Sequence, residues 1–361
     1  MGFEKIQSPQ QENVCPHGND IAQCPQCVWE RRVENQPALK AAEALTQKSR
    51  FRRSSLESPN CELEIGEKKY SVELIERRDH PDLAQVQNLL VDTFSEAEVD
   101  PEEILRAAVE GKTPWGIGDL PYRVYAIKDA EGKAVSMLSG GLLEMRDREG
   151  NDSGESMFMV GYAVTDKNAR QGGLAREAYI SALIGAAADA EAQGRKFAFA
   201  AGECTYTSER FWNNVGWKRV YAADAPGETK SYGELKYIQP AVDFDEETGE
   251  PTEGAGEAPE HLMIDSFNRM PPTKEQIAQT VEAFYLWCNK WPREAFATDA
   301  AYENCMRYVE GFEQKFRKEL EDAGQIIFLD QPSREKALQK GISIREYEEA
   351  DHKEESGEED F

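Results

Sequence analysis

The feature that most constrains this chain is the alternation of strand-like and helix-like segments between residues 67 and 242, followed by one more strand-like run. In the strand-like segments apolar residues alternate with polar ones or form short runs, and elsewhere they recur at helical spacing. The expected strands are 70–79, 122–129, 134–145, 156–166, 196–203, 217–223 and 261–267. The expected helices are 82–96, 101–110, 174–193 and 208–215. This order predicts an α/β domain with a mixed sheet of six or seven strands over about 70–267, flanked by helices.

The 361 residues divide into four parts. Residues 1–66 are polar and contain a group of Cys and His side chains before a short helical pattern. The α/β domain occupies 67–267 and includes an acidic loop at 243–260 that is rich in Gly and Pro. A helical extension is expected over 268–345. We expect the acidic residues 346–361 to form a disordered tail.

The overall charge excludes one broad class of function. A formal net charge of −26 disfavours nucleic-acid binding, which needs a basic face to neutralise phosphates. The charge favours solubility or a cationic partner. No apolar run is long enough for a membrane span, and the start of the chain has no apolar leader stretch. Seven scattered cysteines suit a reducing compartment, so we expect a cytoplasmic protein with no membrane partner.

Residues 164–194 run from the end of a strand through two glycines into a long apolar helix. The first turn of a helix presents unpaired N–H groups and a partial positive charge, and glycine lets a ligand approach the backbone closely. Lys167, Arg170 and Arg176 add positive charge at the same place. This arrangement could hold a pyrophosphate. The alternative is an ordinary strand-to-helix turn without a ligand.

Two motifs in their strand and helix context resemble the GNAT superfamily of acetyl-CoA-dependent N-acetyltransferases. The first is the phosphate-loop pattern Arg/Gln-x-x-Gly-x-Gly/Ala, and the second is an aromatic pair followed by Gly-aromatic. The matching residues are Arg170, Gly173 and Ala175 for the first motif and Phe211, Trp212, Gly216 and Trp217 for the second. The resemblance covers about residues 70–242, extending towards 267, and implies a GNAT-like splayed sheet.

The resemblance implies a cofactor site and a reaction. In this superfamily the fourth strand parts from the fifth, and its exposed backbone, here Tyr162, Ala163 and Val164, pairs with the pantetheine of acetyl-CoA. The pyrophosphate would be held by Arg170 and by the backbone N–H groups of Gln171, Gly172, Gly173, Leu174 and Ala175. The implied activity is acetyl transfer to an amine by direct attack on the thioester. The acceptor would be a cationic small molecule or a basic protein segment.

The sequence departs from the superfamily pattern at the catalytic positions. Trp212 stands where a Tyr commonly protonates the leaving thiolate, and an indole N–H is not a usable acid. We expect Tyr206, just upstream, to take this role. Glu203, at the end of the fifth expected strand, is the candidate general base, and Glu155 is the alternative. The one-residue-longer loop between Val164 and Arg170 also lacks the usual Pro.

A separate motif near the start favours a metal site. Cys15, His17, Cys24 and Cys27 supply four zinc-type ligands within thirteen residues. Val28 stands where a haem-attachment motif needs His. These residues predict one structural Zn²⁺ in a knuckle-like segment. The alternative is a disordered tail with unrelated cysteines.

Aromatic side chains recur at helical spacing in the C-terminal extension. They are Phe284, Trp287, Trp291, Tyr302, Met306 and Phe312. Such stripes predict two helices that pack on the acetyltransferase domain or on a second copy of it, as a homodimer. A different function remains open: a catalytically inactive GNAT-fold module that engages a partner through the zinc segment and these helices.

Overall fold

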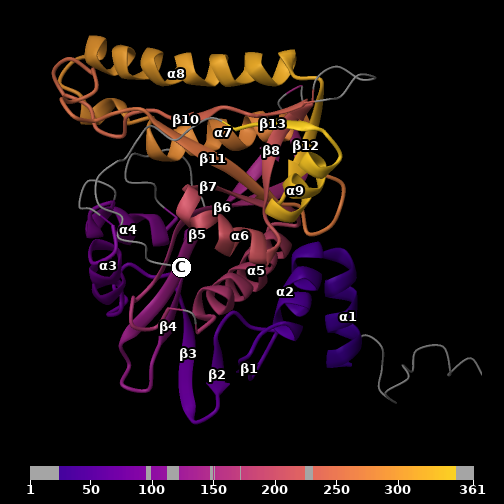
Figure 1. Ribbon diagram of the computed structural model, residues 1–361. Helices are drawn as coiled ribbons and strands as arrows, with labels where there is room; N and C mark the ends of the chain where they lie inside the picture. Colours follow the sequence, from indigo (N-terminus) through magenta and orange to yellow (C-terminus); the bar gives the residue numbers. More distant parts are fainter. Residues whose placement is uncertain are drawn as a thin grey trace, which may run out of the picture.

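The computed structural model describes residues 24–94, 99–111, 122–146, 149, 151–170, 172–223 and 231–346. In these residues one large mixed sheet runs in the order β1-β2-β3-β4-β5-β6-β7-β11-β8-β9-β13, with β10 paired to β11 and β12 paired to β8 (Figure 1). The strands are β1 (Arg52–Arg53), β2 (Cys61–Ile65), β3 (Lys68–Ile75), β4 (Tyr122–Lys128), β5 (Ala134–Arg146), β6 (Asp152–Thr165), β7 (Lys196–Cys204), β8 (Lys218–Ala223), β9 (Ser231–Glu234), β10 (Tyr237–Gln239), β11 (Ala258–Asp265), β12 (Gln325–Leu329) and β13 (Ser343–Arg345).

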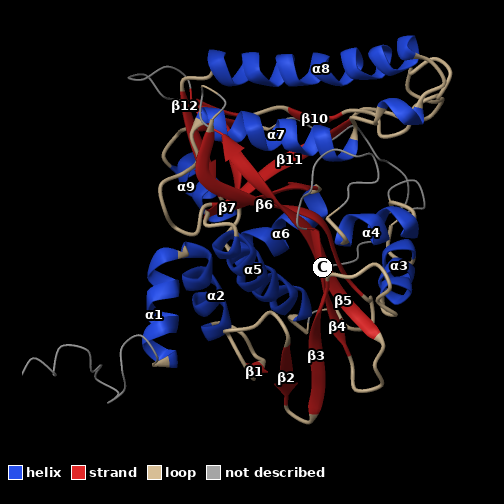
Figure 2. Cartoon of the chain, turned by 180° about the vertical axis from the view of Figure 1, so that it is seen from behind, coloured by secondary structure: helices blue, strands red, loops and turns tan. Residues whose placement is uncertain are grey.

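Helices cover the sheet on both faces, as the α/β prediction requires. They are α1 (Pro25–Asn35), α2 (Pro37–Gln47), α3 (Leu83–Val91), α4 (Glu102–Val109), α5 (Leu174–Ala192), α6 (Tyr206–Val215), α7 (Lys274–Cys288), α8 (Asp299–Asp322) and α9 (Gln331–Gln339), with a short 3₁₀ turn at Arg293–Ala295. Figure 2 shows α1 and α2 beside α5, whereas α7 and α8 lie at the other end of the molecule. The described residues form three large cores: one under α5, one under α7 and α8, and one under α3 and α4.

The helix α5 is apolar on nearly every side, and this composition matches its burial on two sides. Ile180, Leu183, Ile184 and Ala187 have no exposed surface. A helix that is apolar all round needs a second apolar neighbour besides the sheet. The helix α2 supplies it, and its Leu39 belongs to the same core. Residues before position 67 therefore contribute to the core around α5.

The α2–α5 contact has a measurable effect on stability. Leu39 is fully buried, so Leu39→Ala removes packed methyl groups and leaves a cavity. We expect the free energy of unfolding to fall by about 2–5 kcal/mol in chemical denaturation. Lys40→Ala, at an exposed position of the same helix, is the control and should change it by less than about 0.5 kcal/mol. Equal, small effects of both substitutions would contradict the contact.

The strands β6 and β7 are parallel neighbours that pair over only part of their length. Their pairing runs from Glu155 and Lys196 to Met159 and Ala201. Beyond that point β6 continues along β5, and β7 continues along β11. The β5–β6 register shifts between Ser139 and Gly140, where Gly161 is the extra residue of β6. A bulge of this kind bends a strand, so it turns β6 away from β7.

The seven strands expected from the sequence are β3 to β8 and β11, and the four expected helices are α3 to α6. The expected strand count of six or seven was too low, because the described residues add β1, β2, β9, β10, β12 and β13. The C-terminal extension is likewise not wholly helical, since β12 pairs with β8 and β13 pairs with β9. These added strands have two to five residues, too few for a periodic signal.

The aromatic stripe of the extension packs within its own chain. Phe284 and Phe312 are buried in the core under α7 and α8, and Trp287, Trp291, Tyr302 and Met306 pack against that core. The homodimer through these helices stays a prediction. Among the described residues, no helix has both the length and the apolar composition that crossing a bilayer requires.

Candidate functional site

The strands β6 and β7 part beyond Met159 and Ala201, and we call this end of their ladder the opening; the expected cofactor-binding residues lie just past it. Tyr162, Ala163 and Val164 pair with Ser139, Leu138 and Met137 of β5, and they lie past the end of the β6–β7 ladder. The parting of these two strands is the feature that the GNAT resemblance implies for its fourth and fifth strands. A ligand that carries amide groups could add to the β6 edge as another strand does.

The start of α5 has the backbone geometry expected of the phosphate loop. Gly173 precedes the helix with a φ of 93°, in the left-handed region that favours glycine. Arg170 donates from Nε to the carbonyl oxygen of Thr165 at 3.2 Å, so its side chain folds back along the loop. Leu174 is buried and anchors the first turn, with Ala175 beside it. Gln171 and its N–H lie outside the described residues.

A segment that the sequence analysis did not connect with this loop packs against it. A Cβ atom on Gly173 would lie 3.6 Å from Cε2 of Phe51. Arg176 donates from Nη1 to the carbonyl oxygen of Lys48 at 3.2 Å. Arg53 is buried and forms an ion pair with Glu177 at 3.0 Å, in the first turn of α5. The pair neutralises an acidic residue that would otherwise weaken anion binding at this helix end.

Glu203 lies at the β7 edge of the opening. It comes two residues after Ala201, where pairing with β6 ends, and it pairs with Leu262 of β11. Its side chain accepts a hydrogen bond from the hydroxyl of Tyr237. Burial raises the pKa of Glu203 to about 7, although the Tyr237 hydrogen bond acts in the opposite direction. A carboxyl group with this pKa can accept a proton at neutral pH.

The C-terminal end of α7 lies over the bulge in β6. Trp287 stacks on Tyr122 with ring centroids 5.0 Å apart and planes 7° apart. The Tyr122 hydroxyl is 2.9 Å from Oγ of Ser139 and would be 2.5 Å from a Cβ on Gly161. Any side chain at position 161 would therefore collide with Tyr122. The extension thus packs against the bulge at which β6 leaves β7.

The other candidate catalytic residues lie elsewhere or cannot be placed. Trp212 is buried and packs on Trp217, with ring centroids 4.4 Å apart, so it is a core residue of α6. Tyr206 begins α6, and its side chain is outside the described part of the structure. Glu155 lies at the far end of the β6–β7 ladder, where it accepts a hydrogen bond from Gln276 at 2.8 Å.

Two of the four expected zinc ligands are described. Cys24 and Cys27 are buried together at the start of α1, and the described cysteines form no disulfide. Cys15 and His17 lie outside the described residues, so the zinc site stays a prediction. Glu73, His80 and Asp82 are the described group whose ligand atoms are close enough for a metal. The ammonium of Lys128 already binds Glu73 and Asp82 there, the latter at 2.7 Å.

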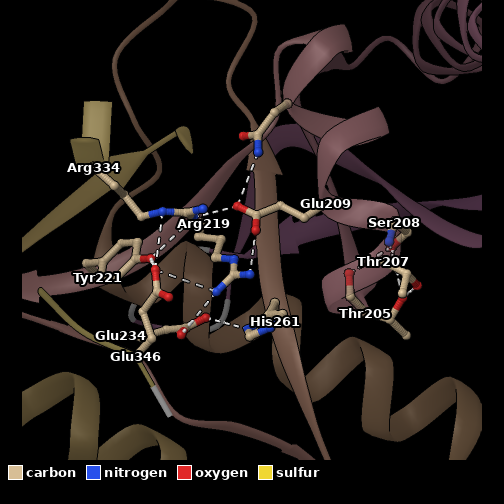
Figure 3. Close-up of polar contacts among 11 residues, drawn as sticks. Thr205, Thr207, Ser208, Glu209, Arg219, Tyr221, Glu234, His261, Arg334 and Glu346 are labelled. Atoms are coloured by element: carbon tan, nitrogen blue, oxygen red, sulfur yellow. Dashed lines mark hydrogen bonds and ion pairs between the residues drawn. The ribbon is translucent and has the colours of Figure 1, made fainter. Parts of the chain in front are cut away.

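A buried ion-pair cluster links α6 to the strands β8 and β9 (Figure 3). Arg219 of β8 is almost fully buried and binds Glu209 at 2.5 Å and Glu234 at 3.5 Å. Burial opposes ionisation of Glu209, but the hydrogen bond from Arg334 and the charge of Arg219 hold its pKa below the usual range. This cluster joins β8, β9, α6 and α9.

Three neighbours of the opening were not predicted from the sequence: Tyr237, Trp287 and Cys288. Tyr237 stands in a three-residue strand, which carries no periodic signal. Trp287 belongs to an aromatic stripe, which is more often core than site, and Cys288 follows it as the last residue of α7. Burial raises the pKa of the Cys288 thiol, and the charges of Glu203 and Asp100 act in the same direction. The thiol therefore stays protonated beside Glu203.

Comparisons with known proteins give structural matches only. No family model matches the sequence, and no curated protein matches it. Matching solved structures include a GNAT-family acetyltransferase from Staphylococcus aureus (9% identity, covering 55% of this chain and 99% of that one, TM-score 0.31). Another is a GNAT-family N-acetyltransferase from Escherichia coli in complex with CoA (13% identity, covering 54% of this chain and 80% of that one, TM-score 0.30). An acetyltransferase from Trypanosoma brucei also matches (17% identity, covering 41% of this chain and 91% of that one, TM-score 0.28).

These matches name the superfamily that the two motifs resemble.

Proposed function

We propose that the chain is an N-acetyltransferase that moves an acetyl group from acetyl-CoA to an amine, with Glu203 as the general base. The supporting observation is the position of the Glu203 carboxyl group, two residues past the end of the β6–β7 ladder and held by the Tyr237 hydroxyl; burial there raises its pKa to about 7. Most aliphatic amines are protonated near neutral pH and must lose a proton before they attack. A carboxylate at this position is placed to take that proton.

The residues around the opening fit a CoA thioester. Tyr162, Ala163 and Val164 would offer backbone groups to the pantetheine amides. Arg170 and the N–H groups of Gln171 to Ala175 would hold the pyrophosphate, helped by the absence of a Cβ at Gly172 and Gly173. The buried Arg53–Glu177 pair keeps an acidic side chain from opposing the phosphates.

In the proposed reaction the amine gives a proton to Glu203, directly or through one water. Its nitrogen lone pair then attacks the thioester carbonyl carbon, and as the C–S bond breaks the nitrogen releases its second proton to solvent and the amide forms. The CoA thiolate leaves and takes up a proton. Tyr206 remains our candidate for that acid. The acceptor class we propose is a cationic small molecule or a basic protein segment, in keeping with the net charge of −26.

Glu203→Gln tests the general base. We expect kcat at pH 7 to fall by about 10²–10⁴-fold, with partial recovery at higher pH as more amine arrives deprotonated. In the wild type kcat/KM should rise through pH 7, because Glu203 accepts a proton only when ionised. The measurement is amine-dependent CoA release. Glu155→Gln, at the other end of the ladder, is the matched control and should keep the wild-type pH dependence.

Two other outcomes would change this assignment. A higher KM with an unchanged kcat would make Glu203 a substrate anchor. A wild-type chain that binds CoA but releases none with any amine would be the inactive binding module.

Gly173→Glu tests the phosphate loop. The substitution places a negative charge where the pyrophosphate is proposed to bind, so acetyl-CoA affinity should fall at least about tenfold in calorimetry. Gly173→Ala is the control, because it imposes the same strain at a φ of 93° without the charge. Unchanged affinity in the Glu variant would move the phosphate site elsewhere.

We also propose one structural Zn²⁺ held by Cys15, His17, Cys24 and Cys27. The support is the burial of Cys24 and Cys27 together at the start of α1. Elemental analysis of reduced protein purified without chelator should find one zinc per chain. The double variant Cys24→Ser, Cys27→Ser should lose it, whereas Cys61→Ser, in β2, should keep it. Zinc-free wild-type protein would remove the proposal.

A further inference from the structure

Tyr237 is the hydrogen-bond partner that the structure gives Glu203. It begins β10, whose pairing with β11 places Tyr237 opposite Glu260. Its ring is fully buried, and its hydroxyl donates to Oε1 of Glu203. The two residues are 34 positions apart in the sequence. The contact therefore depends on how β10 is held against the sheet.

Aromatic side chains from the C-terminal helices fix the Tyr237 ring. Tyr285 of α7 stacks on it, with centroids 5.7 Å apart and planes 17° apart. Phe284 of α7 and Phe316 of α8 make edge contacts with it at 6.2 and 6.4 Å. The Tyr285 hydroxyl also donates to the carbonyl oxygen of Ile238 at 2.7 Å. A ring packed on three sides cannot swing its hydroxyl away from Glu203.

We propose that Tyr237 is a positioning residue for Glu203: its hydroxyl holds one carboxyl oxygen and leaves the other for the acceptor amine. This inference rests on the proposed acetyl transfer. A hydrogen bond donated to a carboxylate favours its charged form, whereas burial alone disfavours it. The C-terminal helices thereby become part of the catalytic apparatus, because they hold Tyr237.

The neighbouring titratable groups do not compete in this pH range. They are Tyr285 and Cys288 of α7 and Cys204, next to Glu203 on β7. Burial raises the pKa of each of these groups, so all three stay neutral where Glu203 ionises. Tyr237 itself also stays protonated, because burial and the charge of Glu203 raise its pKa.

The test is the pH dependence of kcat/KM in Tyr237→Phe, which keeps the ring and removes the hydroxyl. The acidic limb of the profile should move up by about one pH unit, because Glu203 loses the bond that favours its ionised form. Activity near pH 6 should then fall about tenfold, and activity near pH 9 should approach that of the wild type. An unmoved acidic limb would overturn the proposal, even if the variant were less stable.

Tyr308→Phe is the matched control. It removes a tyrosine hydroxyl that packs against the core under α7 and α8, but that hydroxyl accepts a hydrogen bond from the backbone N–H of Ala241 and does not contact Tyr237 or Glu203. The control should keep the wild-type position of the acidic limb. If both variants shift the limb equally, general loosening of that core explains the effect and the specific role of Tyr237 fails.

A direct titration separates this inference from the proposed function. Protein labelled with ¹³C at the Glu carboxyl carbons can be followed by NMR, with the Glu203 signal identified by its loss in Glu203→Gln. A higher carboxyl pKa in Tyr237→Phe than in the wild type supports the role of Tyr237 without any turnover. An equal pKa in the two proteins overturns it. Absence of acetyl transfer by the wild type would instead remove the proposed function.

Discussion

The candidate site depends on one constraint: the hydrogen-bond ladder between β6 and β7 stops partway along the two strands. β6 and β7 are parallel neighbours only as far as Met159 and Ala201, and the extra residue at Gly161 then turns β6 away. A continuous ladder would satisfy these backbone groups internally and leave no place for a ligand between the strands. Gly161 is required at the bend because the Tyr122 hydroxyl occupies the space of a side chain.

Both ends of the chain support this opening. On one face α2 completes the burial of α5, and residues 48–53 pack on the first turn of that helix. On the other face α7 and α8 build a core that reaches Tyr237 and, through it, Glu203. Segments that look like appendages in the sequence therefore determine the geometry of the two sides of the opening.

The central fold could be predicted from the sequence because its strands and helices are long enough to show their period. The parting of β6 from β7 was implied by the resemblance, and the place of Glu203 near the end of β7 followed from the strand pattern; its catalytic role stays a prediction. The remainder could not be predicted, for local and long-range reasons. Strands such as β10 and β12 are too short for a pattern, and they form because a neighbouring strand edge is available. The Tyr237–Glu203 contact is a hydrogen bond between residues far apart in the sequence, so no local pattern predicts it. The sequence also did not show that Trp212 packs in the core.

The ion-pair cluster around Arg219 has a consequence for how the molecule unfolds. Arg219 and Glu234 come from the sheet, Glu209 comes from α6, and Arg334 and Glu346 come from the last described part of the chain. Detaching α9 and β13 would leave the carboxylate of Glu209 buried with half of its counter-charge, which is far costlier than losing an exposed pair. We therefore expect α9 and β13 to detach only when the sheet itself unfolds, in one cooperative transition.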